Sequence, residues 1–364
     1  SDWFKYVKKL NNKVVAMTIN GKLAAIFEMT DHLRLDTRQT ICELQKRAIK
    51  PMIITGDNFI AAQRIVQKLK IKGKVVEVSE LSTIQNIKEV SAICEVLPED
   101  KLMILKLLKN KGYVVGMVGD GMNDAPALKA ADVGIATSNA VDLAKQSAGI
   151  IMQKEGIGSI TDILDSGHRV YQRMMTWTIT KLSRTAQLAI LLTLGYWIAN
   201  FIPINLNAIV LVAILNDLVT MVLGTDNTNI SYNPERWNMQ KLIKISLIFT
   251  IGWVLSGMLL FIGLFKLNIM PPKIGTIMFL FLIFSAMLTI LMTRTGKAFE
   301  KGKPSKMVLA VIIINCIFVS VLSIFGKVVY PISWKWVLII FIGTLGLAVI
   351  IDAIKVKYYN NIDD

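Results

Sequence analysis

The densest group of chemically useful side chains is a short acidic turn. It covers residues 119–124 and reads Gly-Asp-Gly-Met-Asn-Asp. Its carboxylates and amide are hard oxygen ligands, and its two glycines let the backbone turn tightly. Such ligands suit Mg²⁺, which usually keeps several waters and binds a substrate phosphate through one or two carboxylates. The turn therefore predicts a magnesium and phosphate site at Asp120, Asn123 and Asp124.

Two smaller polar segments carry groups that suit the same phosphate. Thr55, Gly56 and Asp57 follow a strand-like run, and Lys101 follows Leu-Pro-Glu-Asp at the start of a helix-like run. A lysine supplies a compact point charge to a phosphate. Taken alone, Asp57 also fits the N-cap of the helix that follows it, and Lys101 also fits a solvated helix position. The acidic turn is the more specific of these signals.

Alternating strands and helices position these side chains. Strands are predicted at 52–55, 75–78, 92–96, 113–118, 133–136 and 149–152, and helices at 58–69, 101–109 and 125–131. This alternation predicts an α/β domain with a parallel sheet and helices on both faces. Ligands of such sheets bind at the carboxyl ends of the strands. Both the Thr55 segment and the acidic turn are predicted to lie at such ends.

The second half of the chain has a different composition. The whole chain is 53% hydrophobic and 18% charged, whereas soluble domains average about 45–50% and about 25%. A helix needs about 20 apolar residues to cross a bilayer. Six stretches meet this length: 178–199, 204–224, 242–265, 274–293, 307–326 and 334–354. They predict an all-α bundle of six transmembrane helices in a lipid bilayer.

The remaining composition excludes two classes of protein and indicates an orientation. Three scattered cysteines form neither a disulfide framework nor a metal site. The net charge of +15 lies largely in short loops rather than on one basic face, which argues against nucleic acid as a partner. If residues 1–176 are cytoplasmic, the inside loops and tail hold ten Lys and Arg against four outside. This excess predicts a cell-membrane protein whose soluble half is cytoplasmic.

Ionisable side chains occur inside two of the predicted spans. The first span holds Lys181 and Arg184, and the second holds Asn216 and Asp217. Charged groups inside a membrane are costly and tend to mark pathways or partners. Asp217 beside a cation fits a structural ion pair and a carrier site equally well. Lys181 lies near the cytoplasmic end, and we expect it to extend its ammonium to the interface.

The motifs together resemble a known family. The run from Met117 to Ala136 closely resembles the hinge signature of P-type ATPases, and the segments at 55–57 and 97–101 reproduce two more of their motifs in the same order. The resemblance covers nearly the whole chain. It implies a haloacid dehalogenase-like (HAD-like), Rossmann-type phosphorylation domain followed by the last six membrane helices of such a pump.

The resemblance also implies roles and boundaries. Asp120 would coordinate the catalytic Mg²⁺ with support from Asn123 and Asp124, Thr55 and Lys101 would contact the transferred phosphate, and Asp57 would shape the pocket. Asp31 and Arg34 occupy the place of the family's Asp-Pro-Pro-Arg hinge to the nucleotide domain, although both prolines are absent. The implied regions are the end of the nucleotide-binding domain (1–26), the phosphorylation domain (27–165), a stalk (166–177), six spans (178–354) and a short cytoplasmic tail (355–364).

The implied reaction is phosphoryl transfer from ATP to an aspartate, followed by hydrolysis of the aspartyl phosphate. The family's nucleophile lies in an Asp-Lys-Thr-Gly-Thr motif, which this sequence does not contain. We expect it in a missing N-terminal part of the same pump, together with most of the nucleotide domain and four more helices. The chain alone is therefore expected to be inactive.

The nature of the ion is inferred from the second span. Calcium needs six to eight oxygen ligands, and calcium pumps place an Asn where this helix has Ala213. A single Asp facing a cation suits a proton carrier, because burial favours its protonated form and an approaching cation expels the proton. The segment around Asn216 and Asp217 also looks like the plasma-membrane proton pumps. The alternatives are a calcium or other cation pump and an inactive truncated membrane protein.

Overall fold

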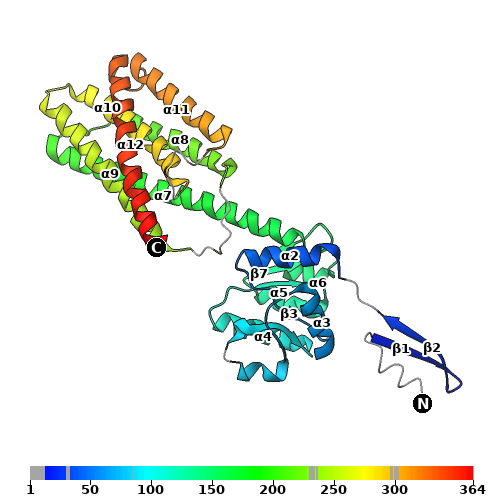
Figure 1. The fold of residues 1–364 in the computed structure, drawn as a ribbon. Helices are drawn as coiled ribbons and strands as arrows, with labels where there is room; N and C mark the ends of the chain where they lie inside the picture. The colour runs from blue at the N-terminus through cyan, green and yellow to red at the C-terminus, as the bar shows by residue number, and fades with distance from the viewer. Residues whose placement is uncertain are drawn as a thin grey trace. The chain divides into compact units, whose positions relative to one another are not determined.

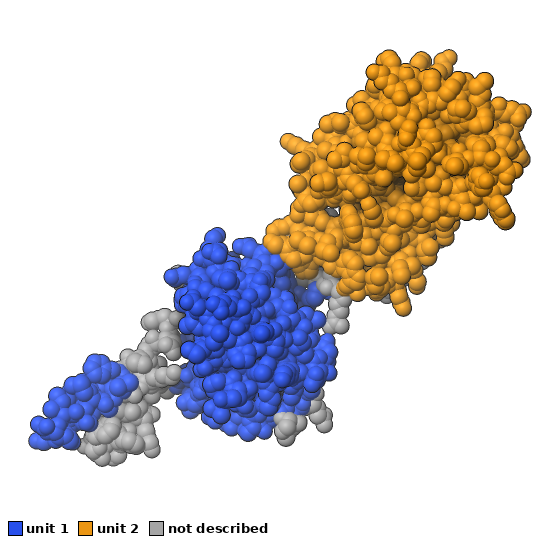
Figure 2. Space-filling view, turned by 180° about the vertical axis from the view of Figure 1, so that it is seen from behind, with its two compact units in different colours: residues 1–164, 232–234 blue, residues 165–231, 235–364 orange. Residues whose placement is uncertain are grey.

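The chain forms two compact units in the computed structural model. The first comprises residues 1–164 with 232–234, and the second comprises 165–231 with 235–364 (Figure 2). The structure describes residues 13–29, 33–84, 86–228, 234, 237–295, 298 and 303–363. Each unit is considered by itself below.

The first unit contains an antiparallel hairpin and two parallel sheets (Figure 1). The hairpin pairs β1 (Lys13–Ile19) with β2 (Lys22–Met29). One sheet has the order β3 (Ile53–Ile54), β5 (Val90–Cys94), β4 (Lys74–Glu77), and the other has the order β6 (Gly116–Gly119), β7 (Val133–Ala136), β8 (Ile150–Ile151). The predicted strands and their parallel direction are confirmed. The prediction of a single sheet differs from the two three-stranded sheets observed.

The two sheets nevertheless share a hydrophobic core. Ala92 of the first sheet, Ile135 of the second and Val66 of a helix belong to one buried cluster. Ile53 and Val118, which are partly buried, pack against it. Burial of these side chains holds the two sheets in one unit. The helices of the unit are α2 (Leu35–Lys46), α3 (Phe59–Leu69), α4 (Pro98–Asn110), α5 (Ala125–Ala130) and α6 (Asp142–Ser147), with short 3₁₀ turns at η1 (Val78–Thr83), η2 (Ile87–Glu89) and η3 (Met122–Asp124).

Local signals explain where the helices nearest the predicted site begin. Asn58 caps α3, because its side-chain oxygen accepts a hydrogen bond from the backbone N–H of Ala61. The alternative that Asp57 is this cap is therefore wrong. In α4, Pro98 occupies the first turn and the Asp100 carboxylate accepts from the N–H of Leu97. Both helices begin directly after segments that carry predicted site residues.

The second unit is a helical bundle (Figure 1). Its elements are α7 (Ser159–Ala199), which begins in the first unit, α8 (Leu206–Val222) with the turn η4 (Leu223–Thr225), α9 (Met239–Lys266), α10 (Pro271–Thr293), α11 (Lys306–Phe325) and α12 (Trp334–Asp363). The five elements from α8 onward are long and apolar enough to cross a membrane. The chain is thus a multi-pass membrane protein with a separate α/β unit.

The predicted span at 178–199 stays a prediction. It forms the C-terminal part of α7, which is not among the five helices that meet the length and hydropathy of a span in the described chain. Lys181, Arg184 and Gln187 lower the hydropathy of this segment. Two of these polar side chains contact neighbouring helices: Lys181 contacts Asp217, and Gln187 contacts Ser285.

Helix α10 lies at the centre of the bundle. It contacts α8, α9, α11 and α12, and 89% of its most apolar window is buried. The Lys355 ammonium donates hydrogen bonds to the carbonyls of Met292 and Thr295 at its C-terminal end and forms a 2.6 Å ion pair with Asp352. Cations stabilise helix C-termini. Asp352 is buried in this contact.

Candidate functional site

The Thr55 segment continues the edge of a sheet beyond β3. The N–H of Thr55 donates to the carbonyl of Ile93, and the N–H of Val96 donates back to the carbonyl of Thr55. The Thr55 hydroxyl and the Asp57 carboxylate lie 3.1 Å apart, and the N–H of Asp57 donates to the same hydroxyl. A Cβ added to Gly56 would lie 3.3 Å from the carbonyl oxygen of Val96. The segment is thus a fixed turn that holds a hydroxyl and a carboxylate together at a strand end.

The acidic turn holds a second fixed pair. It follows β6 and includes η3, so it lies at the carboxyl end of a parallel strand. The Lys101 ammonium of α4 contacts Asp124 Oδ1 at 2.6 Å, and Asp124 Oδ2 accepts from the N–H of Gly121 at 3.2 Å. The two charged side chains are 20% and 9% exposed. The structure therefore places Lys101 against the acidic turn rather than in solvent.

Close packing sets the position of Asp124. A Cβ added to Gly119 would lie 2.6 Å from the Asp124 Cβ, which is closer than side-chain carbons pack. A Cβ added to Gly121 would lie at an ordinary 3.5 Å from Asp124 Oδ2. Gly119 is therefore the residue of the turn whose missing side chain makes room for the ion pair.

The residues of the turn fit a magnesium ion whose remaining ligands come from waters and a substrate phosphate. Asp120 and Asn123 are exposed, whereas both carboxylate oxygens of Asp124 are already engaged. No group of three or more His, Cys, Asp or Glu residues forms a metal cage in the described part of the chain. Mg²⁺ does not need such a cage, since one or two carboxylates and a phosphate satisfy it with waters. The donor set of Asp120 and Asn123 is of this kind.

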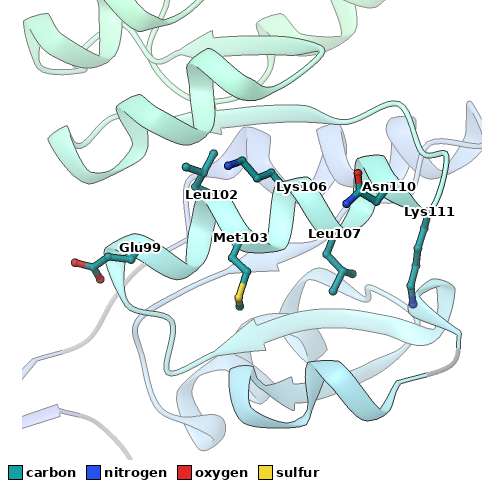
Figure 3. Close-up of a pocket in the computed structure, with 7 residues that line it drawn as sticks. All are labelled: Glu99, Leu102, Met103, Lys106, Leu107, Asn110 and Lys111. Atoms are coloured by element: carbon teal, nitrogen blue, oxygen red, sulfur yellow. The ribbon is translucent and has the colours of Figure 1, made fainter.

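A separate hollow lies along the outer face of α4. It has a volume of about 580 Å³, and Figure 3 shows its lining side chains: Glu99, Leu102, Met103, Lys106, Leu107, Asn110 and Lys111. Lys101 points to the acidic turn from another face of the same helix. The hollow is thus distinct from the predicted catalytic residues.

The structure describes one of the two residues of the predicted hinge. Asp31 lies outside the described residues. Arg34 precedes α2, and its guanidinium lies 3.8 Å from the Glu155 carboxylate, with both side chains more than half exposed. An exposed ion pair of this length contributes little to stability. Its role in a hinge stays a prediction.

Three ionisable side chains of α7 and α8 meet at one cavity. The Lys181 ammonium of α7 contacts Asp217 Oδ1 of α8 at 2.6 Å. Lys181 is thus paired with Asp217, and its extension to the membrane interface stays a prediction. The cavity beside this pair has a volume of about 110 Å³ and is lined by Lys181, Arg184, Thr185, Gln187, Leu188, Val212, Ala213, Asn216, Asp217 and Leu282. The polar residues that the sequence places inside the first two predicted spans thus line one space, among them Arg184, Asn216 and Asp217.

Arg184 and Gln187 face this cavity in different ways. Arg184 Nε and Nη1 are buried and have no hydrogen-bond partner among the described residues. Gln187 Nε2 donates to the Ser285 hydroxyl of α10 at 3.1 Å, with both side chains buried. Gln187 is therefore tied to the central helix, whereas the Arg184 guanidinium keeps its hydrogen-bonding capacity for the cavity.

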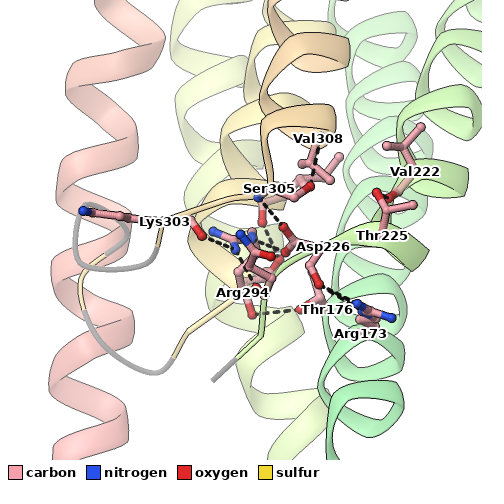
Figure 4. A network of polar contacts seen from close by, with 12 residues as sticks. Arg173, Thr176, Val222, Thr225, Asp226, Arg294, Lys303, Ser305 and Val308 are labelled. Atoms are coloured by element: carbon pink, nitrogen blue, oxygen red, sulfur yellow. Dashed lines mark hydrogen bonds and ion pairs between the residues drawn. The ribbon is translucent and has the colours of Figure 1, made fainter. Parts of the chain in front are cut away.

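A buried network near one end of the cavity helices ties four segments together (Figure 4). The Asp226 carboxylate, just after η4, pairs with the Arg294 guanidinium at the end of α10 and accepts from the N–H of Ser305 before α11. The Arg173 guanidinium of α7 donates twice to the Asp226 carbonyl, at 2.7 and 3.1 Å. Asp226 and Arg294 are each 4% exposed as side chains. The network links the helices that carry Lys181 and Asp217.

Comparison with known proteins agrees with this architecture. Residues 2–132 match the family of haloacid dehalogenase-like hydrolases, and residues 102–164 match a second family of the same description. A putative cation-transporting ATPase of Methanocaldococcus jannaschii is 31% identical over 94% of this chain and 44% of its own length. Plasma membrane ATPase 1 of Saccharomyces cerevisiae is 28% identical over 84% of this chain and 35% of its own length.

The match extends across both units. Probable proton ATPase 1A of Leishmania donovani is 28% identical over 76% of this chain and 33% of its own length. The chain spans less than half the length of these relatives. The chain is homologous to the P-type ATPases, and its soluble unit carries their HAD-like hydrolase domain.

Proposed function

We propose that the chain is the C-terminal part of an ATP-driven cation pump that works through an aspartyl phosphate and exports protons across the cell membrane. The observation that supports the aspartyl-phosphate reaction is the Lys101–Asp124 contact at the carboxyl end of β6. It presents a cation and an acidic turn at the edge of a parallel sheet, where ligands of such folds bind. The homology to cation-transporting and plasma membrane ATPases supports the same reaction.

Each residue of the soluble site has a proposed part in phosphoryl transfer. Thr55 and Lys101 hold the transferred phosphate through a hydroxyl and a point charge, and Asp57 orients Thr55 through their 3.1 Å contact. Asp120 and Asn123 would hold Mg²⁺. When bound, the ion neutralises charge on the phosphate oxygens. Asp124 holds Lys101 in place through their ion pair.

The nucleophilic aspartate would come from a segment that precedes residue 1. In the described chain, β3 and β6 each pair on one side only, although Ile53 and Val118 on these strands share one core. An unpaired edge is a ready template for another strand. We propose that a strand ending in the nucleophile pairs here, between Thr55 and the acidic turn.

The ion pair in the bundle supports a proton carrier. A carboxylate at membrane depth that contacts one cation offers too few oxygen ligands for calcium. Protonation of Asp217 would release Lys181, and the return of Lys181 would expel the proton. The side chains of both residues are about half exposed, at 46% and 57%. Charge exposed on a bundle face is costly in lipid, so we propose that the missing helices of the same pump cover this face.

A second candidate function is a pump of the same family that transports a cation other than the proton. The relative from Methanocaldococcus jannaschii is named only as cation-transporting. A calcium or other cation pump would need oxygen ligands from the missing helices. The non-enzymatic alternative is an inactive truncated membrane protein.

Phosphoenzyme formation separates these readings. We would express the protein with its upstream region and measure acid-stable labelling by γ-³²P-ATP together with vanadate-sensitive ATP hydrolysis. We expect labelling that Lys101→Ala reduces by about 100-fold, and hydrolysis that depends on pH but not on calcium. Calcium-dependent hydrolysis would support the second candidate function. An upstream region without the nucleophile motif would support the inactive protein.

A further inference from the structure

The cavity between α7 and α8 holds more positive than negative charge. Its ionisable lining residues in the described chain are Lys181, Arg184 and Asp217, so Asp217 is the one carboxylate that lines it there. Asp217 is already in contact with the Lys181 ammonium at 2.6 Å. The Arg184 guanidinium is therefore the cation of the cavity that no carboxylate contacts. Two cations and one anion leave the site with one excess positive charge.

Part of the Arg184 guanidinium has no partner among the described residues, although Arg184 lines the cavity. Its Nε and Nη1 are shielded from solvent and form no hydrogen bond within the described chain. A guanidinium presents its N–H groups in a planar fork and cannot lose its charge in a protein. Buried charge is stabilised by a partner that also accepts its hydrogen bonds. The described lining offers Arg184 no carboxylate that is free of another cation, because Lys181 already contacts Asp217.

We propose that this cavity binds one small monovalent anion of halide size, held by Arg184. A space of about 10–15 Å³ already admits one water molecule, so about 110 Å³ accommodates an ion together with waters. Asn216 and the Thr185 hydroxyl line the same space. The Asn216 Oδ1 atom has no hydrogen-bond partner among the described residues.

The proposal concerns the resident counter-ion of Arg184 and not the transported ion. It uses the same cavity as the proton pathway, but it holds whether or not Asp217 carries a proton. The anion would also balance the charge beside Asp217 when that residue is neutral. Binding and transport can therefore be tested separately.

Chloride is the probe for the direct test. The protein would be purified in lipid nanodiscs in a gluconate buffer, because gluconate is too large for the cavity. Bound ³⁶Cl⁻ would be measured by equilibrium dialysis, and the thermal midpoint of unfolding would be followed during chloride titration. We expect saturable binding of one chloride per chain and a midpoint that rises with chloride but not with gluconate.

Two substitutions in the cavity are expected to act in opposite directions. Arg184→Gln should weaken chloride binding at least about tenfold, because it removes the cation that lacks a carboxylate partner. Asp217→Asn should tighten it several-fold, because it removes the carboxylate from the cavity lining. Lys266→Gln, at the exposed end of α9, removes an equal charge far from the cavity in sequence and should leave binding unchanged.

The opposite signs keep the test decisive. If Arg184→Gln does not fold, the effect of Asp217→Asn on binding still distinguishes an anion site from a hydrated cavity. The absence of saturable chloride binding, or weaker binding in Asp217→Asn, would overturn the proposal in favour of water alone. If the unsubstituted protein binds chloride but transports no protons, this result would contradict only the proposed pump mechanism.

Discussion

At the scale of single residues, the missing side chain of Gly119 decides whether the Lys101–Asp124 pair can form. An added methyl group would lie 2.6 Å from the Asp124 Cβ, so Gly119→Ala must displace Asp124. We expect a loss of about 1–3 kcal/mol in the free energy of unfolding, and a loss of phosphoenzyme in the completed pump. Thermal unfolding and phosphorylation measure the two effects.

Gly121→Ala is the matched control for this substitution. Its added Cβ meets Asp124 Oδ2 at 3.5 Å, an ordinary contact. It should leave unfolding nearly unchanged. Equal destabilisation by both substitutions would show that close packing against Asp124 is not the cause.

Asp132 gives the soluble unit a dependence on pH. Its carboxylate accepts from the N–H of Val115 at 2.8 Å and pairs with Lys109 at 2.9 Å. These contacts, the backbone hydrogen bond first, hold the pKa of Asp132 below its ordinary value of 3.8. A depressed folded-state pKa stabilises the fold above the unfolded-state pKa, and this stabilisation is lost as the pH falls toward the folded value.

Asp132→Asn should therefore be destabilising at neutral pH. Because the side chain is about one-third exposed, we expect a loss of about 0.5–1 kcal/mol at pH 7. The difference from the unsubstituted protein should shrink at pH 3. Thermal unfolding at both pH values checks this, and an equal loss at pH 3 would contradict it.

Sequence reasoning finds some of these residues and misses their partners. Asp217 and Arg184 are predictable because a charge inside an apolar run stands out. The Lys181–Asp217 contact is not, because it depends on how α7 and α8 rotate against each other. The Lys101–Asp124 contact likewise joins residues that are 23 positions apart.

At the scale of elements, the Asp226–Arg294 pair fixes the ends of the helices around the cavity. Arg294→Gln would leave the Asp226 carboxylate buried without its cation, and both side chains are 4% exposed. Removal of one partner of a buried pair costs about 3–5 kcal/mol. We expect this loss in thermal unfolding in nanodiscs.

The double substitution separates the pair from its surroundings. Asp226→Asn combined with Arg294→Gln should cost less than the sum of the two single substitutions. Lys303→Gln is a suitable control, because the bond from Arg294 goes to the backbone carbonyl of Lys303, which the substitution keeps. Strict additivity of the two losses would show that the contact does not couple α8 to α10.

Elements are predicted better than their arrangement. All six strands after residue 50 and the helices between them follow from the alternation of apolar runs, and α3, α4 and α5 lie within a few residues of their predicted bounds. The split into two sheets is not predictable, because strand order depends on pairing between distant segments. The Asp226 network is missed for the same reason, since Arg294 follows it by 68 positions.

At the scale of the whole molecule, the chain couples an HAD-like soluble unit to a bundle of membrane helices. Five of the six predicted spans are confirmed by length and hydropathy. The sixth is set apart by Lys181, Arg184 and Gln187, all of which line the cavity. The departure from a regular span thus marks the segment to which we assign ion transport.

ATP-driven acidification of inside-out vesicles tests the central claim most directly. The protein would be expressed with its upstream region, and Asp217→Asn would be compared with Lys266→Gln, whose charge lies at the exposed end of α9. We predict that the unsubstituted protein and Lys266→Gln acidify the vesicles, and that Asp217→Asn abolishes acidification because the carrier is lost. Vesicle acidification that survives Asp217→Asn would contradict proton transport through Asp217.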